Sequence, residues 1–254
     1  MNDHSLFYFE HRAEKSPYPP LLLIHGAGGI HLGWPPQVRR LKHVWVIAPD
    51  LPGHGQSDGE AHQAIGDYTA DLLRLLDGLG IERVIVAGHS MGGAIAQQLA
   101  LDAPGRVAGL VLVSTGARLP VTPVILENVI GSTGTVIDFV MTYAYGPTTG
   151  EDILRLGRQT LEACPPQTLY NDYLACSVFD SRDRLDSIQV PALIVGGGED
   201  KMTPARFSVY LDEYLPRSSL HLIERAGHMI PVEYPDLLAD IITEWLNEHF
   251  TAAR

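Results

Sequence analysis

Residues 84–93 read VIVAGHSMGG, an apolar run followed by the pattern Gly-x-Ser-x-Gly and the start of a helix-like segment. A serine on a sharp strand-to-helix turn is held in a strained backbone conformation with its hydroxyl exposed. The positions two residues before and after it must be small, because a β-carbon there would collide with the turn; they are Gly88 and Gly92. The pattern therefore predicts that Ser90 is a nucleophile.

A nucleophilic serine needs a base, and the base needs an acid to orient it. Asp200 follows the apolar run at 192–195, and His228 follows the run at 220–223. Serine, acid and histidine thus occur in the chain order expected for a nucleophile on this kind of turn. We expect His228 to act as base and then as acid, with Asp200 orienting its imidazolium.

Two other positions compete for the role of the acid. Glu199 adjoins Asp200, but a shift of one residue points its side chain elsewhere. The apolar run at 110–113 is followed by Ser-Thr-Gly at 114–116, which contains no carboxylate. Asp200 is therefore the preferred acid.

The remaining histidines are not needed for this chemistry. His89 adjoins the serine, yet neighbouring residues on such a turn diverge, and we expect it to pack or hydrogen-bond beneath the turn. His31, His54 and His62 have no special sequence context, which favours surface or loop positions. No HxxxH or HExxH pair occurs, so the sequence predicts no metal site.

The loop HGAGG at 25–29 predicts the second part of an oxyanion hole. Gly26 and Gly28 let the backbone approach a substrate closely. We expect two donors to the oxyanion, the N–H of Ala27 and the N–H of Met91, which is the residue after the nucleophile.

A dinucleotide-binding loop is the alternative interpretation of these glycines, with Asp50 after the next apolar run as the ribose ligand. The pattern Gly-x-Gly-x-x-Gly is not met, because position 31 is histidine. Pro35 and Pro36 also interrupt the helix that such a loop should begin. The oxyanion interpretation is therefore preferred.

Short apolar runs alternate with helix-like patterns, which is typical of an α/β fold: a three-layer sandwich with a mostly parallel sheet between helices. The expected strands are residues 21–24, 44–48, 84–87, 110–113, 192–195 and 220–223, with an edge strand at 6–9. The expected helices include residues 64–79, 91–101 and 237–250. Residues 117–187 break this rhythm and indicate a helical insertion between two blocks of one core domain, 1–116 and 188–254.

Composition limits the partners of the chain. Thirty acidic residues against eighteen basic ones give the 254 residues a formal charge of −12, which argues against nucleic acid and anionic membranes as partners. No apolar stretch approaches the ~18 residues of a transmembrane span, and the first residues lack a signal-peptide pattern. We therefore expect a cytoplasmic protein. Cys164 and Cys176 are expected to be free or to form one optional disulfide.

Five motifs in the correct order resemble the α/β-hydrolase superfamily, in particular its small carboxylesterases, lactonases and cofactor-free haloperoxidase-like members. They are HGAGG (25–29), APDLPGHGQSD (48–58), VIVAGHSMGGAIAQQLA (84–100), LIVGGGEDKMTP (193–204) and ERAGHMIPVEYPD (224–236). The resemblance implies a mostly parallel sheet, a helical cap between the sixth and seventh strands, and no cofactor. The family often has two strands before the first motif, where this chain has room for one.

The expected reaction is hydrolysis of a small neutral carboxylic ester, with a short- to medium-chain acyl group, through an acyl-enzyme. A serine nucleophile excludes resemblance to the members of this fold that attack through aspartate. Lactone hydrolysis, C–C bond hydrolysis and perhydrolase chemistry with the same triad are the alternatives, although C–C hydrolases tend to carry Asn where this chain has His89. A catalytically silent binding protein is a further alternative. The sequence leaves the oligomeric state open.

Overall fold

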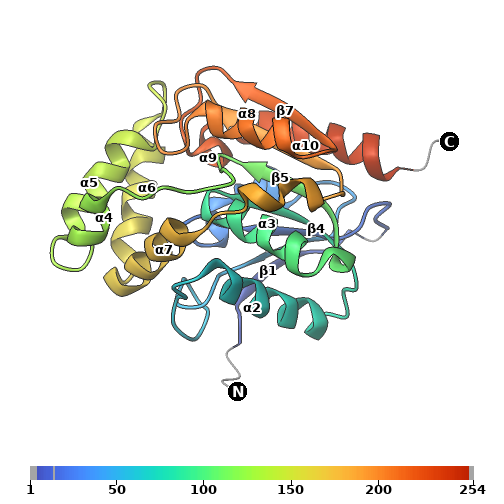
Figure 1. Ribbon diagram of the computed structural model, residues 1–254, viewed down its shortest axis with the longest axis horizontal. Coiled ribbons are helices and arrows are strands. Elements are labelled where there is room, and N and C mark those ends of the chain that lie inside the picture. The colour runs from blue at the N-terminus through green and yellow to red at the C-terminus, as the bar shows by residue number, and fades with distance from the viewer. Residues whose placement is uncertain (1–4, 14, 252–254) are drawn as a thin grey trace.

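The computed structural model describes residues 5–13 and 15–251, which form one sheet with helices on both faces (Figure 1). The strands are β1 (Tyr8–His11), β2 (Leu21–Ile24), β3 (Val46–Pro49), β4 (Val84–His89), β5 (Val107–Val113), β6 (Ala192–Gly197) and β7 (Ser218–Ile223). Their spatial order is β1-β3-β2-β4-β5-β6-β7, and all neighbours are parallel except β1 and β3. The mostly parallel sheet of an α/β sandwich is thereby confirmed.

Burial explains why the central strands have near-continuous apolar sequences. Every residue of β2, β3, β4, β5 and β6 is buried, because helices cover both faces of the sheet. Successive side chains alternate between the two faces. Ile24 belongs to one apolar cluster together with helices α2 (Ile65–Gly78), α3 (Met91–Asp102) and α8 (Ala205–Tyr214). Its neighbour Leu23 belongs to the other cluster.

The second apolar cluster lies on the opposite face of the sheet. It includes side chains of α1 (Pro36–Arg39) and α10 (Pro235–Phe250), for example Val38 and Ile242. The short elements of the chain are the 3-10 helices η1 (His31–Gly33), η2 (Pro104–Arg106) and η3 (Arg182–Ser187), and the helix α9 (Ile230–Glu233). None of the helices formed by the described residues is long and apolar enough to span a bilayer. Cys164 and Cys176 are both buried and unbonded.

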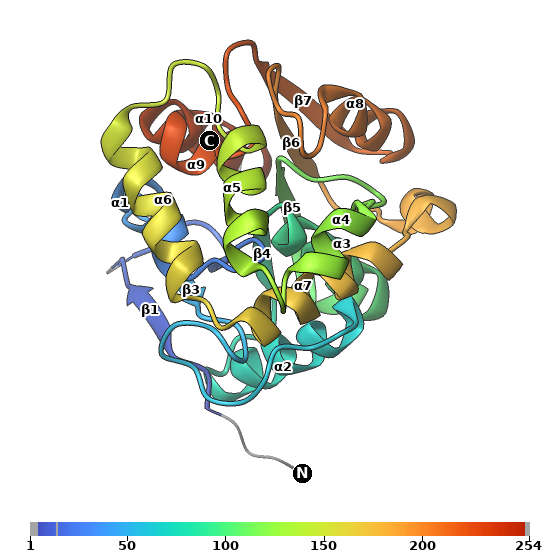
Figure 2. The same cartoon turned by 90° about the vertical axis from the view of Figure 1, so that its left-hand side faces the viewer.

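The segment between β5 and β6 is helical, and we call its helices the inserted helices. They are α4 (Pro123–Asn128), α5 (Thr133–Tyr143), α6 (Glu151–Ala163) and α7 (Pro166–Val178). They stand together at one end of the sheet (Figure 2) and share an apolar cluster of their own. The resemblance implied an insertion between the sixth and seventh strands, but it lies between β5 and β6, because one strand precedes β2 in the described part of the chain.

Candidate active site

Three loops at the carboxyl ends of the strands carry Ser90, Asp200 and His228. These loops follow β4, β6 and β7 directly, and the three strands are parallel. Ligands of open α/β sheets bind at the carboxyl ends of the strands, where all three loops lie. The topology therefore places the residues singled out in the sequence at the edge where chemistry is expected.

The backbone of Ser90 is strained. Its φ is 53° and its ψ is −116°, a left-handed conformation that non-glycine residues rarely adopt. A β-carbon on Gly88 would lie 2.0 Å from the carbonyl oxygen of Gly92, and one on Gly92 would lie 2.3 Å from the carbonyl oxygen of Ile24. The turn can therefore form only with glycine at both positions, as its sequence pattern requires.

Two hydrogen bonds to β5 and the residues after it fix this turn. The N–H of Ser90 donates to the carbonyl of Val113 (2.9 Å), and the hydroxyl of Thr115 donates to the carbonyl of Ser90 (2.8 Å). The strained conformation of Ser90 is thus held by hydrogen bonds to both of its backbone polar groups.

Asp200 and His228 are in direct contact. Oδ2 of Asp200 lies 2.9 Å from Nδ1 of His228, and both residues are buried. Oδ1 accepts from the N–H groups of Met202 and Thr203, both at 2.8 Å, while the Thr203 hydroxyl donates to Oδ2 at 2.8 Å. Burial by itself would raise the pKa of the Asp200 carboxyl, but His228 and the Thr203 donors outweigh it and hold the pKa below its usual range. The structure therefore contains an ionised acid that orients a histidine.

His89 supports the loop that carries His228. Nε2 of His89 lies 2.9 Å from the carbonyl oxygen of His228, and the two rings are 5.0 Å apart. A carbonyl only accepts, so Nε2 of His89 carries the proton. Burial, together with the nearby His228, lowers the pKa of His89 to about 3. His89 is thus a neutral hydrogen-bonding residue, as the sequence suggested.

Glu233 holds the other side of the His228 loop. Its carboxylate accepts from the N–H groups of Gly227 (3.0 Å) and Met229 (3.0 Å), which flank His228, and from the N–H of Gly146 (2.9 Å), which follows α5. The N–H of His228 itself donates to the carbonyl of Ala144 at 2.7 Å. The histidine loop is therefore tied to the inserted helices at several points.

The loop at 25–29 lies against the serine turn. A β-carbon on Gly26 would lie 3.3 Å from Cβ of Ser90. The N–H of Gly28 donates to Oδ2 of Asp172 (2.8 Å), and the N–H of Gly29 donates to the carbonyl of Gly26 (3.0 Å). In the described part of the chain this leaves the N–H of Ala27 without an acceptor.

Met91 supplies a second N–H group at the same place. Met91 is the first residue of α3, and the N–H groups of a first helical turn have no acceptor within the helix. The helix N-terminus also carries a partial positive charge. The N–H of Met91, directly after Ser90, and the N–H of Ala27, on the loop that packs against the serine turn, are thus the two candidate oxyanion donors.

His31 and His54 were expected at surface or loop positions; His54 lies in a loop and His31 begins η1, but neither is at the surface. His54 is 2% exposed and His31 is 7% exposed. His54 contacts Asp172 (2.8 Å), and Nδ1 of His31 contacts Oδ1 of Asp50 (2.8 Å). His31 and His54 belong to the segments that follow β2 and β3, and each contacts a buried carboxylate from another segment of the chain.

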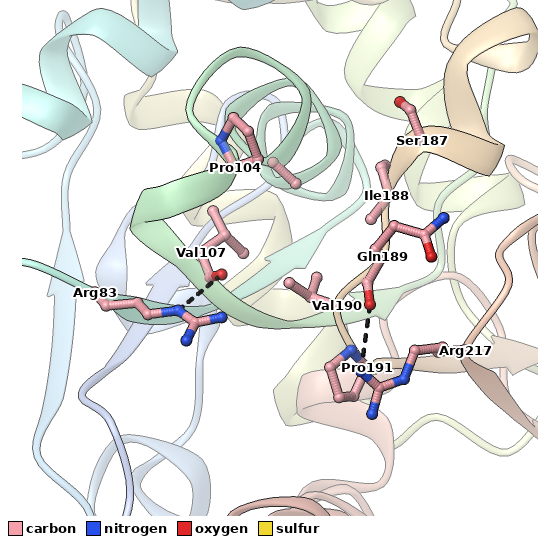
Figure 3. A pocket seen from close by; sticks show the side chains of 10 residues that line it. Arg83, Pro104, Val107, Ser187, Ile188, Gln189, Val190, Pro191 and Arg217 are labelled. Carbon is pink, nitrogen blue, oxygen red and sulfur yellow. Dashed lines mark hydrogen bonds between the residues drawn. The ribbon is translucent and has the colours of Figure 1, made fainter.

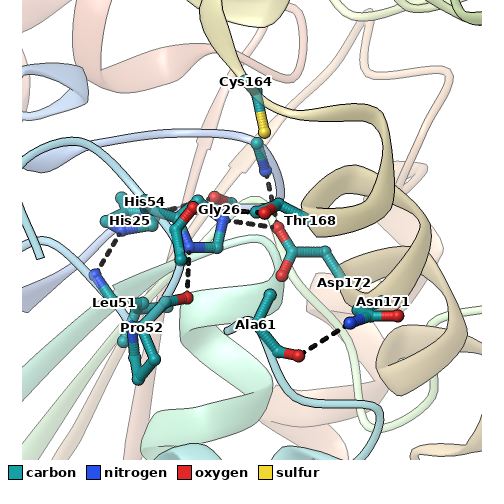
Figure 4. A network of polar contacts seen from close by, with 12 residues as sticks. His25, Gly26, Leu51, Pro52, His54, Ala61, Cys164, Thr168, Asn171 and Asp172 are labelled. Carbon is teal, nitrogen blue, oxygen red and sulfur yellow. Dashed lines mark hydrogen bonds and ion pairs between the residues drawn. The ribbon is translucent and has the colours of Figure 1, made fainter. Parts of the chain in front are cut away.

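Asp172 is the site residue that sequence reasoning missed. It lies on α7 with no exposed surface, and Figure 4 shows it beside the loops of His25 and His54. An ionisable residue in the middle of a buried helix is rarely left without partners. The signal available in the sequence was therefore a carboxylate in the middle of a segment that was expected to be helical.

The inserted helices bring apolar side chains to the site. The apolar cluster of the inserted helices contacts Ala27, Met202 and Met229. Ala27 belongs to the loop at 25–29, Met202 is two residues after Asp200, and Met229 follows His228. A surface hollow of about 330 Å³ lies elsewhere, at the amino-terminal ends of the strands, and Arg83 and Arg217 line it (Figure 3). No group of three or more His, Cys, Asp or Glu among residues 5–13 and 15–251 is placed to hold a metal ion.

A mostly parallel sheet with a serine on the turn after a central strand is typical of the α/β hydrolases. A sequence model of the alpha/beta hydrolase family matches residues 21–241, and the chain belongs to this family. It is 29% identical to a putative carbamate hydrolase, RutD, of Azorhizobium caulinodans, over 97% of this chain and 96% of that one. It is 31% identical to a 2-hydroxymuconate semialdehyde hydrolase of Pseudomonas putida, over 90% of this chain and 87% of that one.

A solved structure gives the same result. A thermophilic esterase from Thermogutta terrifontis, solved with malate bound, superposes with a TM-score of 0.88 at 27% identity. The match covers 98% of this chain and 95% of the esterase. The chain is therefore a hydrolase whose relatives carry the names of several different reactions.

Proposed function

We propose that this chain is a serine hydrolase that cleaves carboxylic esters with short- to medium-chain acyl groups. The observation that carries the proposal is the buried Asp200–His228 pair, 2.9 Å apart, at the same sheet edge as a serine with φ of 53°. An acid–histidine pair and an exposed serine on a strained turn are the parts that acyl transfer needs.

The reaction proceeds in two half-reactions. Oγ of Ser90 attacks the ester carbonyl while His228 takes its proton, and the N–H groups of Ala27 and Met91 stabilise the resulting oxyanion. His228 then protonates the departing alcohol, which leaves an acyl-Ser90. Water, deprotonated by His228, attacks this acyl group, and the carboxylic acid departs as Ser90 recovers its proton.

In this proposal residues 117–187, which contain the inserted helices, form a cap that supplies the apolar wall of the site. Leu161 and Leu169 pack against the oxyanion loop, since a β-carbon on Gly28 would lie 3.1 Å and 2.8 Å from their methyl carbons. A wall of this kind favours an uncharged acyl or alcohol group. The Arg155 and Arg158 side chains of α6 are largely exposed and pair with carboxylates, so they do not supply an anion site there.

C–C bond hydrolysis is the second candidate, and the relative named as a semialdehyde hydrolase favours it. The same triad can serve both reactions. His89 stands where such enzymes tend to carry Asn, and its Nε2 is already used by the His228 carbonyl. Ester hydrolysis is therefore preferred.

The test is a series of p-nitrophenyl esters from acetate to octanoate, with Ser90→Ala as the matched control. We expect turnover by the wild type, no turnover above background by the variant, and labelling of Ser90 alone by a fluorophosphonate probe. Equal cleavage by both proteins would overturn the role of Ser90. Labelling of Ser90 without ester turnover would instead move the assignment to a C–C or carbamate substrate.

A further inference from the structure

Asp172 connects an inserted helix to three segments of the core. Its Oδ2 accepts from the N–H of Gly28 (2.8 Å) and from Nε2 of His54 (2.8 Å), and its Oδ1 accepts from the hydroxyl of Tyr68 (2.6 Å). These donors come from the loop after β2, the loop after β3 and helix α2. Asp172 has no exposed surface, so this carboxylate is held entirely by protein groups (Figure 4).

His54 supplies the counter-charge. Its Nε2 faces Asp172, and its Nδ1 lies 3.0 Å from the carbonyl oxygen of Pro52. Both neighbours are acceptors, so both ring nitrogens carry protons and the ring is an imidazolium. Burial by itself would lower the pKa of His54, but Asp172 outweighs burial and raises it. The buried carboxylate of Asp172 is therefore paired with a cation. An isolated charge at this buried position would have a large energetic cost.

His25 is a second imidazole beside this pair, and it is neutral. It lies 4.9 Å from the His54 ring. Its Nδ1 contacts the carbonyl of Gly26 (2.9 Å), and its Nε2 accepts from the N–H of Leu51 (3.0 Å). Burial and the positive charge of His54 lower the pKa of His25 to about 4. A single proton at Nδ1 satisfies both contacts, so the cluster holds one positive and one negative charge.

We propose that Asp172 is a positioning residue for the oxyanion hole. It holds the N–H of Gly28, whose φ is +65°, and the turn is completed by the N–H of Gly29 donating to Gly26. Both of these N–H groups are occupied, whereas the N–H of Ala27 between Gly26 and Gly28 has no acceptor among the described residues and is available to a substrate. The inference rests on the proposed function, and it assigns to α7 a part in transition-state stabilisation besides the apolar wall.

The contacts of Gly28 show why this bond matters to the loop. Leu161 and Leu169 pack over Gly28 on the side of the inserted helices, so the neighbours of Gly28 there are apolar and offer no other acceptor. Without the carboxylate, the Gly28 N–H would be buried without a hydrogen-bond partner, which is unfavourable. A shift of the peptide to recover a partner would move the Ala27 N–H with it.

The test compares Asp172→Ala with Asn171→Ala, a matched control on the same helix. Asn171 is also buried, but its Nδ2 donates to the carbonyl of Ala61, away from the oxyanion loop. For a p-nitrophenyl ester, we expect Asp172→Ala to lower kcat by about tenfold or more, with KM changed by less than about twofold. Affinity for a trifluoromethyl ketone, whose adduct carries an oxyanion, should fall by the same factor as kcat/KM. Asn171→Ala should leave kcat and this affinity within about twofold of the wild type.

A second readout does not depend on ester turnover. Hydrogen–deuterium exchange of the peptide that contains Gly28 should quicken in Asp172→Ala and stay unchanged in Asn171→Ala. If the wild type neither turns over esters nor reacts with a fluorophosphonate, the proposed function fails, while the exchange comparison still decides whether Asp172 holds the loop.

Asp172→Asn covers the case in which the alanine variant does not fold. It keeps one acceptor oxygen but cannot serve donors on both sides, so kcat and ketone affinity should fall to values between the wild type and Asp172→Ala. Unchanged kcat, ketone affinity and loop exchange in the folded variants would overturn the proposal. So would an equal loss in Asn171→Ala, since that would show a general effect of disturbing α7.

Discussion

Nδ1 of His228 lies 2.9 Å from Oδ2 of Asp200, and the hydroxyl of Thr203 donates to the same carboxylate oxygen. Two backbone N–H groups occupy the other oxygen. This set of donors keeps Asp200 ionised, and it fixes the proton of His228 on Nδ1. The remaining nitrogen, Nε2, is thereby the atom that we propose to act as the base.

Replacing Asp200 by Asn should lower kcat by about 10⁴-fold, because an amide can donate to Nδ1 and stabilise the wrong tautomer of His228. The measurement is steady-state ester hydrolysis at neutral pH. Asp152→Asn is the control, since that carboxylate lies on α6 with 90% of its side chain exposed. A loss below about tenfold in Asp200→Asn would show that another group orients His228.

The lowered pKa of Asp200 predicts how stability depends on pH. A carboxyl group whose folded pKa lies below its unfolded value of about 3.9 stabilises the protein above that pH and loses the effect as pH falls through the folded pKa. Asp200→Asn should therefore flatten the fall of unfolding free energy with pH in the acid range. Urea denaturation at a series of acid pH values measures this. Identical slopes in wild type and variant would contradict the lowered pKa.

The serine turn should not tolerate a methyl group. Gly88→Ala puts Cβ 2.0 Å from a backbone oxygen, so we expect a loss of about 3 kcal/mol or more, or failure to fold. Gly134→Ala is the control, because nothing lies within 4 Å of the added carbon and Gly134 lies in α5. That change should leave stability the same or raise it by up to about 1 kcal/mol. Thermal and urea unfolding of both variants measure the difference.

Three buried histidines should show different protonation states between pH 5 and 7. His54 should be an imidazolium, whereas His25 and His89, with pKa values lowered to about 4 and 3, should be neutral. The stabilisation from charged His54 is complete below about pH 6.5 and is lost as pH rises through its folded pKa. The two neutral rings act oppositely, since they bind protons on unfolding.

Nitrogen-15 spectra of the histidine side chains measure these states directly. His89 should show the proton on Nε2, and His25 the proton on Nδ1, as their hydrogen-bond partners require. Asp172→Asn should lower the pKa of His54 while leaving His89 unaffected. A neutral His54 in the wild type at pH 6 would contradict the ion pair.

The apolar runs predicted the sheet because helices bury both of its faces, but the strand ends required the structure. β5 begins at Val107, three residues before the predicted run. The apolar pattern missed this start because Ala108 and Gly109 are too small to continue it. β7 begins at Ser218 because it pairs with β6 along its whole length, although most of its side chains are not buried. Strand ends follow backbone pairing, and hydrophobicity reports it only where side chains are buried.

Sequence alone determined the fold family and the residues proposed as the triad, because the serine turn imposes local steric requirements and the order of the triad follows from the topology. Only the tertiary structure showed the contacts of Asp172 and its pairing with His54. These residues are 118 positions apart, and His54 has no distinguishing pattern around it. A hydrogen bond needs atoms within about 3 Å, and folding brings the two side chains that close only when α7 packs on the loops of the core.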